Sequence, residues 1–223
     1  MVTIYNYMDK PKRNLKKASV SRGQITRARL LTVATQIFAE KGFEGAAVDE
    51  IVIKADVNKR MVYHYFGSKE ELYQACLVET YAKLETLETI VLSPKLSPAK
   101  AIEAIMEAYF KFLASESEFV RLLLWENLNR GRMIKKHRHL LSKAPLHKHL
   151  EEVVRSGVKQ GVFRKNLDVD FLAISMIGLS FIYYSNQYTL SQGLNLDLSS
   201  RTTRKKAIAF ATALLLQGVK RKS

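Results

Sequence analysis

A short segment gathers side chains of the types that bind nucleic acid: Lys59, Arg60, Tyr63 and His64. Lysine and arginine reach guanine N7 and O6 atoms or phosphate oxygens, and tyrosine and histidine donate to phosphate oxygens. At helical spacing these four side chains share one outer surface, because Val62 and Phe66 are four residues apart and face inward together. The segment therefore predicts a helix that presents cations and hydrogen-bond donors to DNA.

Two short helices across a tight turn are predicted to position these side chains. Val48–Ala55 carries apolar residues on one face, and Asn58 is a candidate N-cap for a second helix over Lys59–Phe66. Asp56 lies where the turn requires a positive φ, which aspartate tolerates better than most residues. This is the arrangement in which a helix-turn-helix protein presents one helix to the major groove.

Helices are also predicted on both sides of this pair. Apolar residues at helical spacing run from Thr26 and stop at Gly42, a residue suited to a C-terminal cap. Gly67 ends the second short helix. The residues from Ser68 to Glu71 then form a capping box, in which Ser68 bonds forward and Glu71 reaches back, at the start of a long helix to about Leu92.

The rest of the chain is predicted to be helical as well, because period-two alternation is missing between its turn signals. Ser97-Pro98 and Asp168 or Asp170 supply helix starts, and 191–200 reads as a polar loop. The further predicted helices cover residues 99–114, 119–129, 150–160, about 168–188 and 201–219. The expected fold class is all-α, with about nine helices.

The net charge favours a polyanionic partner. Lys and Arg number 36 against 21 Asp and Glu, which gives a formal charge of +15. This balance is typical of proteins that bind nucleic acid or an anionic membrane surface, and charge alone does not choose between them. The 47% of hydrophobic residues is enough for apolar cores, so wholesale disorder is disfavoured.

The expected location is the cytoplasm. A single cysteine, Cys76, cannot form an intramolecular disulfide, which fits a reducing compartment. Residues 1–22 lack the continuous apolar stretch of a secretory signal. The longest apolar run, 171–184, is shorter than the roughly 20 residues of a membrane-spanning helix, so no membrane partner is expected.

The helix-turn-helix region resembles the DNA-binding domain of the tetracycline-repressor (TetR) family. The specific part is the tyrosine-aromatic-phenylalanine core followed by Ser-Lys-Glu. The matching residues cover roughly a quarter of the chain and are Gly42-Phe43, Val48, Ile51, Ala55, Asn58–Phe66 and Ser68–Leu72.

This resemblance implies a three-helix DNA-binding domain, a fourth helix that links it to a sensor domain, and a homodimer built mainly by the last two helices. We therefore expect a basic N-terminal arm over 1–22, the helix-turn-helix domain over 23–70, and a ligand-sensing and dimerisation domain over 71–223.

By position, the resemblance also implies which residues contact double-stranded DNA. Lys59, Arg60 and Met61 occupy the base-facing start of the recognition helix. Groove or phosphate contacts are implied for Tyr63, His64 and Tyr65, and a phosphate contact at the start of the next helix for Lys69. An ammonium there, beside backbone N–H donors, can clamp one phosphate.

The sequence departs from the family pattern at four positions. Ala46 and Ala47 replace the usual threonine and serine or threonine, so a capping hydroxyl and a phosphate contact are absent. Asp56 replaces the usual turn glycine, and Val52 replaces a small alanine, which affects the spacing of the two short helices. The basic residues between 10 and 22 either compensate along the DNA or form a solubilising tail.

The C-terminal region is predicted to form the dimer and to bind an unknown small molecule. The apolar residues 171–184, with Gly178, and the amphipathic 207–219 suit a two-fold helical interface, or else the core of a monomer. Polar or aromatic residues within the apolar helices are candidate effector contacts, or else core residues with satisfied hydrogen bonds. These candidates are Tyr109, Trp125, Glu126, Asn127, Arg130, Tyr183 and Asn186.

Other chemistries are disfavoured. His137, His139, His147 and His149 lie among cations, and residues two apart do not share a helix face, so no metal is expected. The basic stretch 130–149 is a solvated surface, or else attracts an anionic effector or distal DNA. Cys76 has no base partner in the sequence, and glycine-rich phosphate loops are missing, so neither a catalytic residue nor a cofactor is expected.

Together these features predict a ligand-responsive DNA-binding regulator. It is expected to be a repressor that binds a palindromic operator as a homodimer and is released by a small molecule. The alternative is a nonspecific binder of nucleic acid or membrane surfaces, which would use the positive charge without needing the turn-helix spacing.

Overall fold

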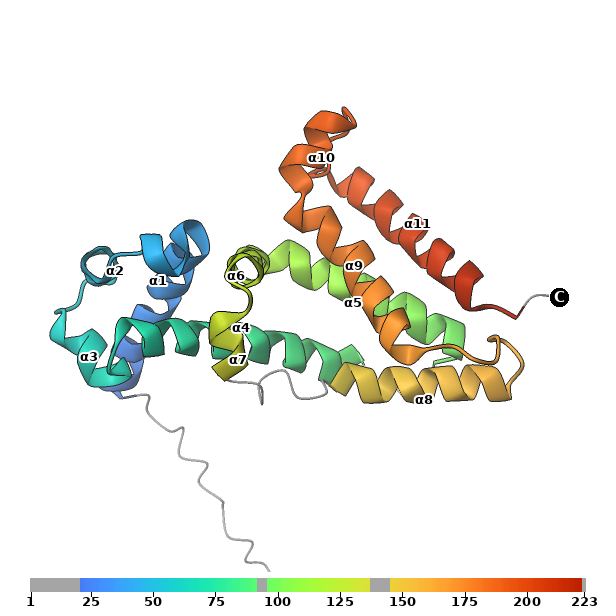
Figure 1. The fold of residues 1–223 in the computed structure, drawn as a ribbon, viewed down its shortest axis with the longest axis horizontal. Helices are drawn as coiled ribbons and strands as arrows, with labels where there is room; N and C mark the ends of the chain where they lie inside the picture. The colour runs from blue at the N-terminus through green and yellow to red at the C-terminus, as the bar shows by residue number, and fades with distance from the viewer. Residues whose placement is uncertain (1–20, 92–95, 137–144, 222–223) are drawn as a thin grey trace, which may run out of the picture.

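The computed structural model describes residues 21–91, 96–136 and 145–221, and its regular elements are all helical (Figure 1). Outside the helices, these residues contain an isolated antiparallel bridge between Phe163 and Lys220. The predicted all-α class is confirmed. The described ranges hold eleven helices rather than the nine predicted.

Four helices form the N-terminal end of the molecule. The first begins earlier than its predicted start at Thr26, because the hydroxyl of Ser21 accepts a hydrogen bond from the backbone N–H of Gln24 at 3.2 Å. Gln24 returns the contact by accepting from the Ser21 N–H at 2.8 Å, which completes a capping box. The four helices are α1 (Arg22–Gly45), α2 (Val48–Lys54), α3 (Arg60–Phe66) and α4 (Lys69–Val91).

Seven further helices follow, and two of them were not predicted. A five-residue helix lies inside the cation-rich stretch, and the predicted single helix from 168 to 188 is two helices that meet at 76°. The N-cap at Asp168 is confirmed, since its carboxylate accepts from the Phe171 N–H at 3.1 Å. The helices are α5 (Pro98–Ser115), α6 (Ser117–Leu128), α7 (Arg132–Lys136), α8 (Pro145–Lys159), α9 (Val169–Ser185), α10 (Gln187–Gly193) and α11 (Arg201–Val219).

No single helix in the described ranges is both long and apolar enough to cross a membrane. Only α9 and α10 taken together, across their sharp bend, reach the necessary length and hydropathy.

The long helix α4 connects the α1–α3 end to the rest of the molecule (Figure 1). α1 packs against both α4 and α6, while α5 packs against α9 and α11 at the opposite end. The apolar core of the N-terminal end includes Phe38 of α1, Ile51 of α2 and Val62 of α3. Leu122 of α6 and Met133 of α7 belong to the same core, so the two ends share buried apolar surface.

Trp125 of α6 packs closely against α1 at Gly42. The backbone there has φ 69° and ψ 179°, a conformation essentially restricted to glycine. A Cβ atom at Gly42 would lie 2.8 Å from Cδ2 of Trp125. The Trp125 indole N–H also donates to the carbonyl of Ala39 at 3.3 Å, so the tryptophan is fixed against the end of α1.

We expect Gly42→Ala to lower the free energy of unfolding by about 2–4 kcal/mol, because the new methyl group adds both backbone strain and overpacking. Urea denaturation followed by circular dichroism measures this change. Gly45→Ala is the matched control, since its Cβ atom would meet only the Cβ of Lys41, at 3.4 Å. Equal unfolding midpoints for the two variants would contradict the packing role of Gly42.

Candidate nucleic-acid interface

The turn between α2 and α3 is built by a left-handed residue, as predicted. Asp56 has φ 50° and stands directly after the C-cap of α2. The Val57 N–H donates to the Val52 carbonyl at 3.1 Å, and the Asp56 N–H donates to the Ile53 carbonyl at 3.1 Å. These two bonds form a Schellman motif, which redirects the chain sharply at the end of a helix.

Two contacts hold this turn in place. The guanidinium of Arg29, on α1, donates to the Asp56 carbonyl at 2.9 Å. The side-chain oxygen of Asn58 accepts from the Arg60 N–H at 2.9 Å, so Asn58 satisfies a free donor at the start of α3. Aspartate therefore takes the place of the family's usual glycine without loss of the turn geometry.

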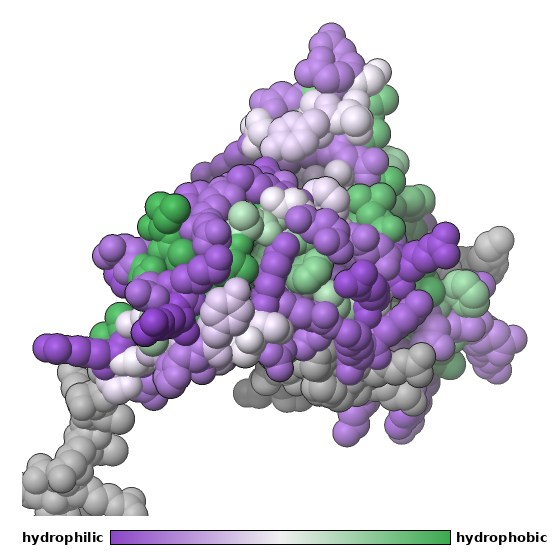
Figure 2. Space-filling model, turned by 60° about the vertical axis from the view of Figure 1, so that its left-hand side comes forward, coloured by the Kyte–Doolittle hydropathy of each residue, from purple (hydrophilic) through white to green (hydrophobic). Residues whose placement is uncertain are grey.

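α3 is anchored by its inner face and exposes its outer face. Val62 is fully buried and Phe66 is 8% exposed, and both belong to the N-terminal core. The Arg27 guanidinium lies 4.9 Å from the centre of the Phe66 ring, a cation–π contact that closes the end of α3. The candidate contact residues Lys59, Arg60, Tyr63 and His64 are exposed, and Met61 and Tyr65 are half-buried. In Figure 2 the molecule is turned so that the α1–α3 end comes forward, and hydrophilic side chains cover most of the visible surface.

One of the outer cations is partly neutralised. The Lys59 ammonium lies 2.7 Å from the carboxylate of Asp49 in the first turn of α2. The hydrogen bond to Asp49, together with the charge of that carboxylate, raises the pKa of Lys59 above its ordinary value. Arg60 takes part in none of the ion pairs between described residues, so its charge is available to a ligand.

Lys69 lies at the start of α4, over the ring of Phe43, with 4.7 Å between its nitrogen and the ring centre. Ser68 caps this helix, since its hydroxyl accepts from the Glu71 N–H at 3.1 Å. Glu71 reaches back to Ser68, where its carboxylate accepts from the hydroxyl at 3.0 Å. The cation–π contact directs the Lys69 ammonium toward the end of α1. Lys69 takes part in none of the ion pairs between described residues.

Ala47, the N-cap residue of α2, makes no side-chain capping bond, as expected from its methyl group. Val52 is 7% exposed and packs in the N-terminal core. The predicted basic arm over 1–22 lies almost wholly outside the described residues, which begin at 21.

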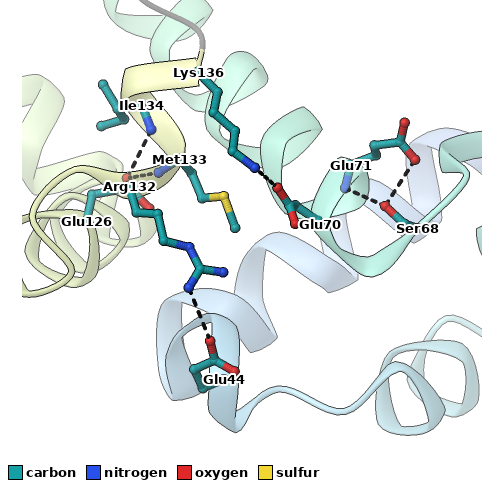
Figure 3. Close-up of polar contacts among 9 residues, drawn as sticks. All are labelled: Glu44, Ser68, Glu70, Glu71, Glu126, Arg132, Met133, Ile134 and Lys136. Carbon is teal, nitrogen blue, oxygen red and sulfur yellow. Dashed lines mark hydrogen bonds and ion pairs between the residues drawn. The ribbon is translucent and has the colours of Figure 1, made fainter.

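The seven candidate effector residues lie in two separate places. Trp125, Glu126, Asn127 and Arg130 lie on or just after α6, beside the N-terminal end, and Tyr109, Tyr183 and Asn186 lie on α5 and at the end of α9. Buried Glu126 accepts from the N–H groups of Met133 and Ile134, both at 3.2 Å (Figure 3). It also accepts from the Tyr73 hydroxyl at 2.9 Å. Tyr183 is also buried and donates to the Leu198 carbonyl at 2.8 Å. Their contact with an effector stays a prediction.

A pocket of about 370 Å³ opens elsewhere, between α5, α6, α9, α10 and α11, and none of the seven residues lines it. Sequence reasoning missed it because its walls come from segments far apart in the chain, including the unpredicted α10. A signal was nonetheless present in Tyr184 and Tyr188, two aromatic residues four positions apart in the sequence beside Ser185 and Gln187.

In the described residues, groups of three or more metal-ligating side chains are absent. His147 instead lies 2.6 Å from the carboxylate of Asp170, and His149 lies 3.9 Å from that of Glu152. His137 and His139 lie outside the described residues.

Comparison with known proteins decides the family. Residues 30–76 match the family model described as bacterial regulatory proteins, tetR family, and residues 98–214 match the tetracyclin repressor-like C-terminal domain. The chain belongs to the TetR family. The HTH-type transcriptional repressor NicS of Pseudomonas putida is 30% identical over 198 residues, which cover 88% of this chain and 93% of the relative.

Other similar proteins agree with this TetR-family assignment. The HTH-type transcriptional repressor SCO4008 of Streptomyces coelicolor is 29% identical, over 69% of this chain and 77% of its own. The structure of the Mycobacterium tuberculosis ketosteroid regulator KstR2 superposes with a TM-score of 0.67 at 20% identity, over 88% of this chain and 95% of its own. The structure of Bacillus subtilis FadR in complex with stearoyl-CoA superposes with a TM-score of 0.68 at 18% identity, over 86% of this chain and 98% of its own. The α1–α3 end is thus the DNA-binding domain of a TetR-type regulator.

We expect Asp49→Asn to tighten DNA binding on the order of tenfold, because it frees Lys59 and removes a carboxylate that would repel phosphate. The slope of the logarithm of the binding constant against the logarithm of salt concentration should steepen by about one, the value of one additional phosphate contact. Fluorescence anisotropy on a labelled promoter fragment over a range of salt concentrations measures both effects. Glu50→Gln is the control, because it removes the same charge from α2, and Glu50 pairs with Lys41 rather than with Lys59. Identical gains for both variants would show that only net charge matters.

Proposed function

We propose that this TetR-family protein is a ligand-responsive repressor that binds a palindromic operator as a homodimer through α3. A small molecule in the C-terminal domain then releases it from DNA. The observation that carries the DNA-binding part is the anchoring of α3 by Val62 and Phe66, which leaves Arg60 and its neighbours exposed. The repressor role is proposed from the names of NicS and SCO4008, while the partial relative FasR of Mycolicibacterium smegmatis is named an activator.

The proposed DNA contacts divide into two kinds. Arg60, with Lys59 and Met61, stands at the start of α3 and is assigned to base edges in the major groove. Tyr63, His64 and Tyr65 follow along α3, and we assign them to the groove or to phosphates. Lys69 at the start of α4 is assigned to a phosphate, where backbone N–H groups add to the attraction.

We expect Arg60→Ala and Lys69→Ala to weaken DNA binding in different ways. Loss of a base contact at Arg60 should cost about 1–3 kcal/mol on the operator and relax sequence preference. Loss of a phosphate contact at Lys69 should weaken operator and unrelated DNA alike and reduce the salt slope by about one. Anisotropy titrations on both DNAs measure this, and a uniform loss in Arg60→Ala would contradict its base-reading role.

The homodimer is proposed from apolar side chains that the single chain leaves uncovered on α9 and α11. On α9, Phe171 is 69% and Ile174 is 61% exposed, and on α11, Phe210 is 73% and Leu214 is 50% exposed. Several large exposed apolar side chains on two packed helices favour a protein–protein interface. A two-fold interface formed by this face would place two α3 helices for the two halves of a palindrome.

We expect Ile174→Asp to shift the protein from dimer to monomer, because a carboxylate buried in an apolar interface lacks a partner. Operator binding should weaken on the order of 100-fold as the avidity of two half-sites is lost. Sedimentation velocity measures the first effect and anisotropy the second. Leu128→Asp is the control, because Leu128 is 75% exposed on α6, away from this face. A dimeric Ile174→Asp variant would place the interface elsewhere.

The competing function is nonspecific binding of polyanions, which the charge of +15 alone would support. Competition with unrelated DNA distinguishes the two functions, since a regulator favours its operator by several kcal/mol. Equal competition by unrelated DNA would overturn the proposed function.

A further inference from the structure

The pocket between α5, α6, α9, α10 and α11 has the size of a small-molecule site, at about 370 Å³. Its apolar wall is formed by Leu113 of α5, Val120 and Leu124 of α6, and Leu198 before α11. Tyr188 of α10 also lines the pocket and is 75% exposed, which places an aromatic ring at its rim. The pocket therefore offers an apolar surface for the body of a ligand.

The charged groups that line this pocket are both cationic. Arg121 comes from α6 and Arg204 from α11, and the thirteen lining residues include no carboxylate. Neither guanidinium takes part in an ion pair with a described residue. Two unpaired guanidinium groups in a partly enclosed site favour an anion, which they can bind through charge-assisted hydrogen bonds.

Two carboxylates lie beside the pocket without lining it. Asp197 accepts from the Ser199 N–H at 2.9 Å and from the Ser199 hydroxyl at 2.5 Å, and these bonds lower its pKa. Glu118 lies 3.4 Å from the Ser117 hydroxyl, at the first turn of α6. Both carboxylates contact lining hydroxyl groups but do not line the pocket themselves.

Neutral polar groups complete the lining. Burial raises the pKa of Tyr184 to about 12, so its phenol stays neutral, and it donates to the Phe110 carbonyl at 2.7 Å. The nearby charge of the Arg204 guanidinium, which lines the same pocket, opposes this rise in the Tyr184 pKa. Ser185 and Gln187 add a hydroxyl and an amide that suit the polar substituents of a ligand.

We propose that this pocket binds a small organic acid, with its carboxylate on Arg121 and Arg204 and its apolar body against Val120 and Leu124. The proposal rests on the proposed ligand-responsive function and names the chemical class of the effector. The occupant is a compact aromatic or aliphatic carboxylate, because the volume of 370 Å³ and the two lining arginines suit one charged group on a small apolar body.

α6 links this pocket to the DNA-binding domain. Arg121 and Leu124 line the pocket, and the next residues, Trp125 and Glu126, contact α1 and α4. An acid that draws Arg121 toward Arg204 therefore acts on the same helix that carries the contact with Gly42. Differential affinity of the acid for two positions of α6 would supply the free energy that changes DNA binding.

The experiment uses the full-length dimer and two pairs of probes, benzoate with benzamide and octanoate with octanamide. In each pair the amide keeps the apolar body and lacks the charge. Isothermal titration calorimetry at millimolar ligand should give saturable binding of at least one acid and at least tenfold weaker binding of its amide. Arg204→Gln and Arg121→Gln should each weaken binding of that acid about tenfold or more, the loss typical of a charge-assisted hydrogen bond.

Lys205→Gln is the matched control, because it removes the same charge from an exposed neighbouring position on α11 and lies outside the pocket. It should bind the acid as the wild type does, and operator binding without ligand reports that all three variants are folded. Absence of binding by both acids would overturn the proposal, as would equal binding of acid and amide or unchanged binding by both arginine variants. If an acid binds through the arginines but leaves operator affinity unchanged, the pocket assignment stands and ligand-induced release fails.

Discussion

The contact of Trp125 with Gly42 is the constraint that ties the two ends of this TetR-family protein together. The indole ring occupies the space where any other residue at position 42 would place its Cβ atom, at 2.8 Å. Beside it, buried Glu126 joins α4 and the start of α7 through three hydrogen bonds. Because close-packed groups have few alternative arrangements, α6 cannot shift without moving α1 or α4.

Exposed ion pairs also join α7 to α4 and α1, and they contribute less to stability. Lys136 pairs with Glu70 of α4, and Arg132 lies 4.0 Å from Glu44 of α1 (Figure 3). Surface pairs of this kind are worth about 0–1 kcal/mol, so they guide the position of α7 rather than hold the domains together. The shared apolar core, which includes Leu122 of α6, carries the larger part of the stabilisation.

The sequence predicted the elements that carry local signals. The capping residues Asn58, Ser68 and Asp168 and the left-handed Asp56 each marked a helix boundary or turn that the structure contains. α7 was missed because five residues within a cationic stretch show no apolar period. α10 was missed because the residue at its bend from α9 is Asn186, so neither a proline nor a glycine marks the end of α9.

In the candidate site, too, only the features with local sequence signals could be predicted. The outer face of α3 follows from helical periodicity, so Val62 and Phe66 could be assigned to the core from the sequence. The Lys59–Asp49 pair joins two helices across a turn, and the pocket joins Arg121 to Arg204 across 83 positions of the chain, so neither could be read from local spacing.

The most direct test of the account measures whether α6 couples the pocket to the spacing of the two DNA-binding domains. Pulsed electron paramagnetic resonance on the proposed dimer, with a spin label at Glu40→Cys on the exposed side of α1, gives this distance, since Cys76 is fully buried. In the operator complex the distribution should be narrow, because the two α3 helices must lie about 34–36 Å apart. A bound organic acid should shift the free dimer away from that distribution. An unchanged distribution with the acid bound would contradict the coupling through α6.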